Sequence, residues 1–154
     1  MAEFFDDLTP GREWVTGGRT VTEHDILTFA GLSGDFNPLH VDAEFAKAGP
    51  FGARIAHGPC TYAIASGLIT GLGVFDGSAI AFLELNWRFT KPVYIGDTIK
   101  ARMVVRESKA SRKPDRGVVT FDIQVLNQDD VVVQEGSWVE LMTRETEETA
   151  EVVT

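Results

Sequence analysis

The sequence predicts a single α+β domain in which a curved antiparallel sheet surrounds a long helix. In the first third of the chain, apolar residues recur at helical spacing over 22–34, and a short helix is expected at 43–48. An uncharged segment follows at 59–75, and from residue 83 onward the period of the apolar residues changes to two. Helices early and strands late predict a layer of helices against a sheet, and the uncharged segment is the helix that the sheet would enclose.

Capping residues predict where the helices begin and end. Thr22 and Asp25 have the spacing of a capping box, and the helix that they begin is expected to end within the glycine-containing segment 31–34. Asp42 is the expected N-cap of the short helix that follows. Proline is favoured at the first helical position, so the uncharged helix is expected to begin at Pro59.

Four segments of alternating polar and apolar residues predict half-buried antiparallel strands. They lie at 83–89, 99–106, 119–125 and 131–142. Taken in chain order, these segments indicate a meander that curls round the uncharged helix.

The uncharged segment is too short to cross a membrane. A spanning helix needs about 20 apolar residues, whereas 59–75 includes Thr61, Ser66, Thr70 and three glycines. We therefore expect a helix that is buried on most sides by the sheet, and no membrane partner.

Length and charge exclude several further classes of protein. A chain of 154 residues can bury a core of its own, which we expect over 1–144, with an acidic and disordered tail at 145–154. The net charge of −9 argues against nucleic acid or an anionic membrane as a partner. A single cysteine, Cys60, and an N-terminus without the features of a signal peptide favour the cytoplasm.

One short segment carries an acid/base pair. The carboxylate of Asp35 and the imidazole of His40 lie five residues apart, on either side of Asn37-Pro38. A helix would not place residues five apart on one face, but a chain interrupted at Asn37-Pro38 can fold back so that both side chains face one cavity. Such a cavity could hold and polarise one water molecule.

This segment resembles the signature of the MaoC-like (R)-specific enoyl-CoA hydratases. The signature has an aromatic, an apolar and a small residue, then Gly-Asp-x-Asn-Pro-apolar-His, and Ala or Ser after five further positions. Every specified position is filled between Phe29 and Ala46, and a second family element, Ile-Ala-His-Gly, follows at 55–58. The resemblance implies a hot dog fold, with one such domain in this chain.

The resemblance also implies an activity: reversible hydration of a trans-2-enoyl-CoA, or of a related unsaturated acyl-CoA such as mesaconyl-CoA, to an (R)-3-hydroxyacyl-CoA. Asp35 and His40 would hold the catalytic water, and we assign His40 as the base and Asp35 as the group that orients it and handles the second proton. The Gly58 amide would stabilise the enolate oxygen at the start of the helix. Pro59 departs from the bulkier apolar residue usual at its position in the family.

Roles for three more residues follow from the resemblance. Asn37 would support the turn and the hydrogen bonding of the pair, although a plain turn-former before Pro38 explains it equally well. Ser66 would lie near the acyl group, with helix packing as its alternative, and His57 is expected to be structural. No metal or redox cofactor is expected, because the sequence has neither a His/Cys cluster at ligand spacing nor Gly-x-Gly-x-x-Gly; coenzyme A enters as part of the substrate.

Two other activities and several partners remain open. A hot dog thioesterase would direct water at the thioester carbonyl and release free thiol, whereas a non-catalytic acyl-CoA-binding subunit would bind without turnover. The resemblance implies a homodimer paired through its sheets, or a higher homo-oligomer, since an unpaired sheet edge would otherwise be exposed. A basic cluster in an expected hairpin could attract the phosphates of coenzyme A or simply be solvated: Arg106, Lys109, Arg112, Lys113 and Arg116.

Overall fold

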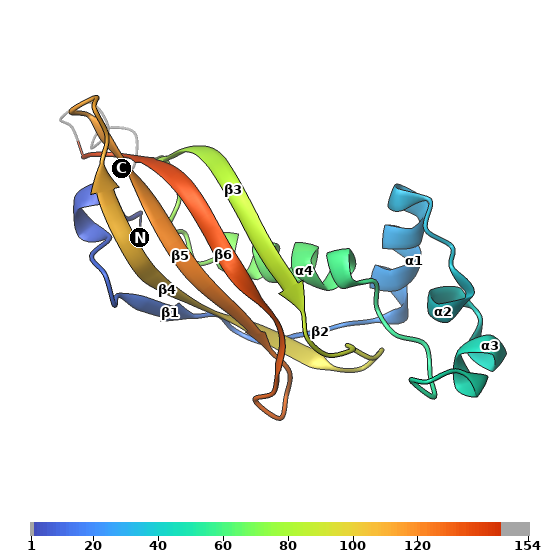
Figure 1. The fold of residues 1–154 in the computed structure, drawn as a ribbon. Coiled ribbons are helices and arrows are strands. Elements are labelled where there is room, and N and C mark those ends of the chain that lie inside the picture. The colour runs from blue at the N-terminus through green and yellow to red at the C-terminus, as the bar shows by residue number, and fades with distance from the viewer. Residues whose placement is uncertain (1, 146–154) are drawn as a thin grey trace.

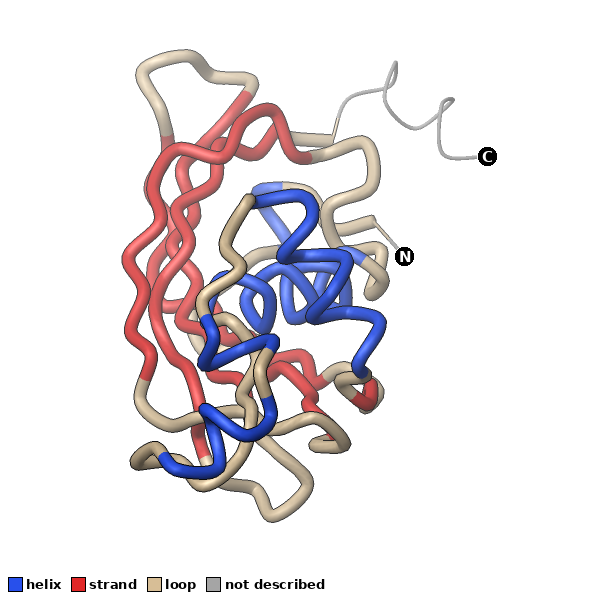
Figure 2. Tube along the Cα trace, turned by 90° about the vertical axis from the view of Figure 1, so that its right-hand side faces the viewer, coloured by secondary structure: helices blue, strands red, loops and turns tan. Residues whose placement is uncertain are grey.

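A computed structural model describes residues 2–145, so all but the first residue of the expected 145–154 tail lies outside the described residues. An antiparallel sheet curves around one helix, α4, and three shorter helices lie beyond one end of it (Figure 1). Seen from the side, the strands form one wall and the helices gather on its concave face (Figure 2). The predicted α+β class is confirmed.

The sheet departs from the predicted meander at one strand. Its six strands are β1 Glu13–Val15, β2 Arg19–Thr20, β3 Ala79–Phe89, β4 Thr98–Ala110, β5 Arg116–Leu126 and β6 Val132–Thr143. Their order is β1-β4-β5-β6-β3, with β2 also paired to β4. The meander is confirmed for β4 to β6 and wrong for β3, which pairs with β6 because the connection over 90–97 is long enough to carry the chain across the sheet.

The helices begin and end close to the expected caps. They are η1 Phe5–Asp7, α1 Glu23–Ser33, α2 Pro38–Val41, α3 Ala43–Ala48 and α4 Gly58–Thr70. Thr22 and Asp25 form the predicted capping box of α1, and Gly34 ends that helix at a φ of 77°, in the left-handed region that favours glycine. The Asp42 side chain accepts a hydrogen bond at the start of α3, as expected.

Helix α4 is shorter than predicted and exposed along one side. It begins at Gly58, so that Pro59 occupies its second position, and it ends at Thr70. Ile64 and Ile69 are buried against the sheet, but the opposite side of the helix is exposed. The exposed positions, 59, 63, 67 and 70, form one narrow stripe, so the expected burial on most sides is confirmed apart from this stripe. Among the described residues, no helix has the length and hydropathy needed to span a membrane.

Strand β3 explains why one side of α4 stays open. It is an edge strand, and both of its faces are largely exposed, so the expected half-burial is wrong here. Its exposed apolar side chains are Ile80, Phe82, Leu83, Leu85 and Phe89. An unpaired edge that also carries this much apolar surface is typical of a protein interface.

One ionisable side chain, Glu140 of β6, is buried on the core face of the sheet. It is 6% exposed, and its register partners are Phe82 of β3 and Val119 of β5. None of the described residues donates a hydrogen bond to its carboxyl group. Burial raises the pKa of Glu140 to about 7, because the charged form loses its hydration.

We expect Glu140→Gln to reduce the dependence of stability on pH. The folded-state pKa of about 7 lies above the ordinary value of 4.5, so the free energy of unfolding should fall as pH rises between these values. The shift corresponds to about 3 kcal/mol. Urea unfolding at about pH 5 and about pH 8 measures this loss. Glu135→Gln, on the outer face of the same strand, is the matched control, and an unchanged pH dependence in Glu140→Gln would contradict the assignment.

Candidate active site

The segment between α1 and α4 brings three ionisable side chains together. Asp35 lies in the turn after α1, His40 lies on α2, and His57 is the N-cap residue of α4. A carboxylate oxygen of Asp35 and one ring nitrogen of each histidine lie within 4.8 Å of one another. The predicted fold-back at Asn37-Pro38 is therefore present, with Pro38 as the first residue of α2.

The hydrogen bond of His40 leaves one of its nitrogens free. Nδ1 of His40 lies 2.8 Å from the carbonyl oxygen of Ile55. A carbonyl oxygen can only accept, so Nδ1 carries the proton. In the neutral ring Nε2 is then the unprotonated nitrogen, which can accept a proton from a bound water.

The turn that carries Asp35 is held by local hydrogen bonds. Oδ1 of Asp35 accepts from the backbone N–H of Asn37 at 3.1 Å, and Oδ1 of Asn37 accepts from the N–H of Leu39 at 3.0 Å. Asn37 thus caps α2. Among the described residues its side chain makes no hydrogen bond to Asp35 or His40, so the observed contacts are those of a turn-former.

His57 contributes more to this cluster than its sequence context indicated. It is 1% exposed, and its Nε2 donates to the carbonyl oxygen of Asp35 at 2.9 Å. Its ring stacks on His40 with centroids 3.8 Å apart and planes at 28°, while Phe29 packs at 5.0 Å. Lone pairs of nearly parallel rings do not converge, so the three side chains are poorly arranged to share one metal ion. The contacts fit the structural role expected for His57.

Gly58 places the start of α4 close to the sheet. A Cβ atom at this position would lie 2.7 Å from the ring of Phe89. The first N–H groups of a helix have no acceptor within it, and Pro59 has no N–H, so the Gly58 N–H is the first donor at this end of the helix and the Cys60 N–H is the next. It directly follows the stacked His57.

A cavity of about 400 Å³ opens beside Gly58. Its walls are mostly apolar and include Phe51, Ile55, Pro59 and Phe89. The carbonyl group of Ile55 binds His40, so the same residue borders the cavity and holds the imidazole. An apolar cavity next to a few fixed polar groups is typical of a small-molecule site.

Comparison with known proteins assigns the family. The MaoC-like domain family matches residues 7–127. The (R)-specific enoyl-CoA hydratase of Rhodospirillum rubrum is 34% identical over 123 residues, which are 79% of each chain. The chain belongs to the MaoC-like dehydratase family. It is also 39% identical over 104 residues to Protein MaoC of Klebsiella aerogenes, but spans only 31% of that longer relative.

Solved structures agree with this assignment. A MaoC-like dehydratase from Rhodospirillum rubrum superposes with a TM-score of 0.84 at 29% identity, covering 93% of this chain and 98% of that one. A Mycobacterium tuberculosis protein described as a double hotdog superposes with a TM-score of 0.82 at 21% identity, covering 95% of this chain and 46% of that one, which supports the fold alone. This MaoC-like chain is a hydro-lyase with a hot dog fold.

Among the described residues, Ser66 makes no hydrogen bond to the acid/base pair of this MaoC-like chain. It lies two turns beyond Gly58 on α4 and is half-buried. No hydrogen bond links its hydroxyl to Asp35 or His40 among the described residues. Its expected position near the acyl group stays a prediction.

The hairpin that carries the basic cluster, at 106–116, lies far from the candidate site of this MaoC-like chain. It joins β4 to β5 at the end of the sheet opposite α1, α2 and α3 (Figure 1). Several of its cations are paired with neighbouring carboxylates: Arg106 with Asp122, Lys109 with Glu107, and Arg116 with Asp115. Within one chain, these contacts fit the solvated alternative.

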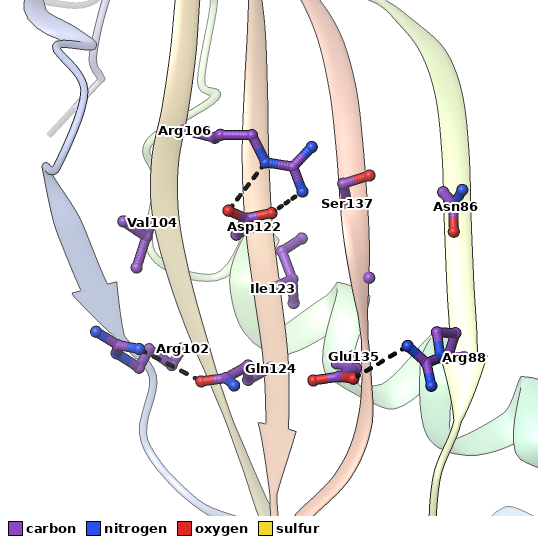
Figure 3. Close-up of a pocket in the computed structure, with 11 residues that line it drawn as sticks. Asn86, Arg88, Arg102, Val104, Arg106, Asp122, Ile123, Gln124, Glu135 and Ser137 are labelled. Atoms are coloured by element: carbon purple, nitrogen blue, oxygen red, sulfur yellow. Dashed lines mark hydrogen bonds and ion pairs between the residues drawn. The ribbon is translucent and has the colours of Figure 1, made fainter.

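A larger hollow, of about 590 Å³, lies on the outer face of the sheet. Side chains of β3 to β6 line it, and its ions pair across strands: Arg106 with Asp122, and Arg88 with Glu135 at 3.9 Å (Figure 3). The sheet separates this hollow from α4, so the candidate site is the smaller cavity beside Gly58.

Proposed function

We propose that this MaoC-like protein reversibly hydrates a trans-2-enoyl-CoA to an (R)-3-hydroxyacyl-CoA through one water held by Asp35 and His40. The observation that carries the proposal is the free Nε2 of His40, fixed by the Ile55 carbonyl group within the cluster that contains the Asp35 carboxylate. The (R)-specific enoyl-CoA hydratase from Rhodospirillum rubrum supports the substrate class. A branched or carboxylated acyl group, such as that of mesaconyl-CoA, belongs to the same class.

The proposed hydration uses three groups of the chain in sequence. Nε2 of His40 takes a proton from water, and the oxygen of that water adds to Cβ of the enoyl group. The electron pair moves to the thioester oxygen, where the Gly58 N–H stabilises the enolate. The protonated His40 then gives this proton to the Asp35 carboxylate, and Asp35 passes it on to Cα, which restores both side chains. This reaction requires no metal or redox cofactor, and coenzyme A is part of the substrate.

We expect Asp35→Asn and His40→Gln each to lower the hydration rate by roughly two to four orders of magnitude, because each removes proton transfer while keeping side-chain size. The double variant should be little worse than the worse single one, since both residues act on one water. Loss of the conjugated enoyl absorbance measures the rate, and calorimetry with butyryl-CoA measures binding.

His24→Gln is the matched control, because His24 is exposed on α1. Two results would refute the hydratase proposal and favour the thioesterase or the acyl-CoA-binding subunit instead. Release of free acid and coenzyme A would identify a thioesterase, and saturable binding without turnover in the wild type would identify a binding subunit.

A pair of substitutions at Gly58 separates its N–H from the space around it. Gly58→Ala and Gly58→Pro both add a Cβ atom against the Phe89 ring, but only proline removes the N–H. His57 has ψ of 136°, which suits a residue before proline. The turnover of Gly58→Pro should be about 100- to 1000-fold below that of Gly58→Ala. Equal turnover in the two variants, both folded by circular dichroism, would exclude the Gly58 amide as the oxyanion donor.

The proposed active form is a homodimer, or a higher homo-oligomer, paired along β3. This strand leaves one edge unpaired, and its apolar side chains stay exposed next to the open side of α4. A second copy aligned antiparallel on β3 would continue the sheet and cover both. A reducing cytoplasm is the compartment that we propose, because Cys60 is a buried free thiol.

We expect Leu83→Lys with Leu85→Lys to dissociate the dimer, because the substitutions place charge on an apolar strand that the partner would bury. Val15→Lys, on strand β1 at the other edge of the sheet, is the matched control, since Val15 is about as exposed as Leu83. Sedimentation velocity gives the mass of each form. A wild-type protein that sediments as an active monomer would contradict the pairing.

A further inference from the structure

A buried glutamine connects the start of α4 to the sheet. Gln134 of β6 is 2% exposed. Its Nε2 donates to the carbonyl oxygen of Gly58 at 2.9 Å, and its Oε1 accepts from the indole Nε1 of Trp87 on β3 at 2.9 Å. One amide therefore joins three elements at the residue whose N–H is the proposed oxyanion donor.

The chemistry of the two partners fixes which way this amide points. An indole N–H can only donate, and a carbonyl oxygen can only accept. Oε1 of Gln134 must therefore face Trp87, and Nε2 must face Gly58. In the reverse orientation, the amide N–H groups would face the indole N–H, and the amide oxygen would face the Gly58 carbonyl oxygen, so neither hydrogen bond could form. Gln134 has only one arrangement that satisfies both neighbours.

Trp87 is itself held in place by packing. Tyr62 of α4 meets its ring edge-on with centroids 4.9 Å apart. Gly136, its register partner on β6, leaves room for the ring, since a Cβ atom there would lie 2.6 Å from Cε3 of Trp87. The indole is therefore a fixed donor that can orient Gln134.

This connection matters because glycine restrains its own backbone weakly. Gly58 has no side chain that could hold the direction of its N–H, and an oxyanion donor acts only when it lies about 2.7–3.1 Å from the developing charge. A hydrogen bond to the Gly58 carbonyl group fixes the position of that residue relative to the sheet.

We propose that Gln134 is a positioning residue for the reaction: it sets the Gly58 N–H toward the thioester oxygen, and Trp87 fixes the orientation of its amide. The inference rests on the proposed hydration, in which that N–H stabilises the enolate. Gln134 acts through Gly58 and transfers no proton.

Gln134→Leu tests the proposal by removing the donor to Gly58. We expect kcat for hydration of crotonyl-CoA to fall roughly tenfold or more, as part of the loss that follows removal of an oxyanion donor, while KM and butyryl-CoA binding change less than about threefold. Gln134→Glu should be at least as impaired at high pH, where its buried carboxyl group is ionised, because a carboxylate accepts from Trp87 but cannot donate to Gly58. Trp87→Phe keeps an aromatic ring, releases the amide and should lower kcat in the same direction.

A spectroscopic probe reports the same effect without turnover. The absorbance maximum of 4-dimethylaminocinnamoyl-CoA moves to longer wavelength when its thioester carbonyl group is polarised. The shift on binding should be smaller in Gln134→Leu and in Trp87→Phe than in the wild type. A residue with a merely structural role would alter stability and leave this shift unchanged.

The control is Gln124→Leu, which removes a glutamine of β5 on the outer face of the sheet, where it accepts a hydrogen bond from Arg102 (Figure 3). It should keep the wild-type kcat and shift. A folded Gln134→Leu or Trp87→Phe with wild-type kcat and shift would overturn the inference while hydration by the wild type stands. A wild type that hydrates no enoyl thioester would overturn the proposed function instead.

Discussion

The close approach of α4 to the sheet at Gly58 is the constraint on which the candidate site depends. Any side chain at this position would meet the ring of Phe89, so the helix could not start at its present distance from β3. The segment just before the helix is tied to the connection between β3 and β4 as well, because Ile55 forms a β-bridge with Tyr94. The Ile55 carbonyl group then has a fixed position from which to accept the hydrogen bond of His40.

The acid/base pair is attached to this scaffold mainly through backbone carbonyl groups. His40 donates to the Ile55 carbonyl group, and His57 donates to the carbonyl group of Asp35. Arg54 adds a two-point ion pair with Glu23, which ties α1 to the segment before α4. Because the backbone supplies these acceptors, the Asp35 carboxylate accepts only one local N–H among the described contacts and keeps acceptor capacity for a water.

Local patterns predicted the parts of this structure that depend on neighbours in the chain. The Thr22 and Asp25 capping box, the Asp42 cap and the break at Asn37-Pro38 are set by residues a few positions apart. Periodicity could not predict that β3 crosses to β6, because alternation gives the faces of a strand and not its partner. Gly58 was found only through the family resemblance, since no local pattern marks a free N–H.

Long-range contacts are what sequence reasoning missed. The stacking of His57 on His40 joins residues on opposite sides of α3, and the Gln134 contact joins β6 to α4. No sequence pattern indicates that Gln134 lies beside Gly58 and Trp87. This becomes visible only when the pairing of β3 with β6, which places Phe89 opposite Gln134, is known. Phe89 also borders the cavity beside Gly58 and belongs to the exposed row of β3. If two copies pair along β3 as proposed, the surface that a partner covers and the wall of the acyl site share this residue. Assembly and the shape of the site are then set by the same strand.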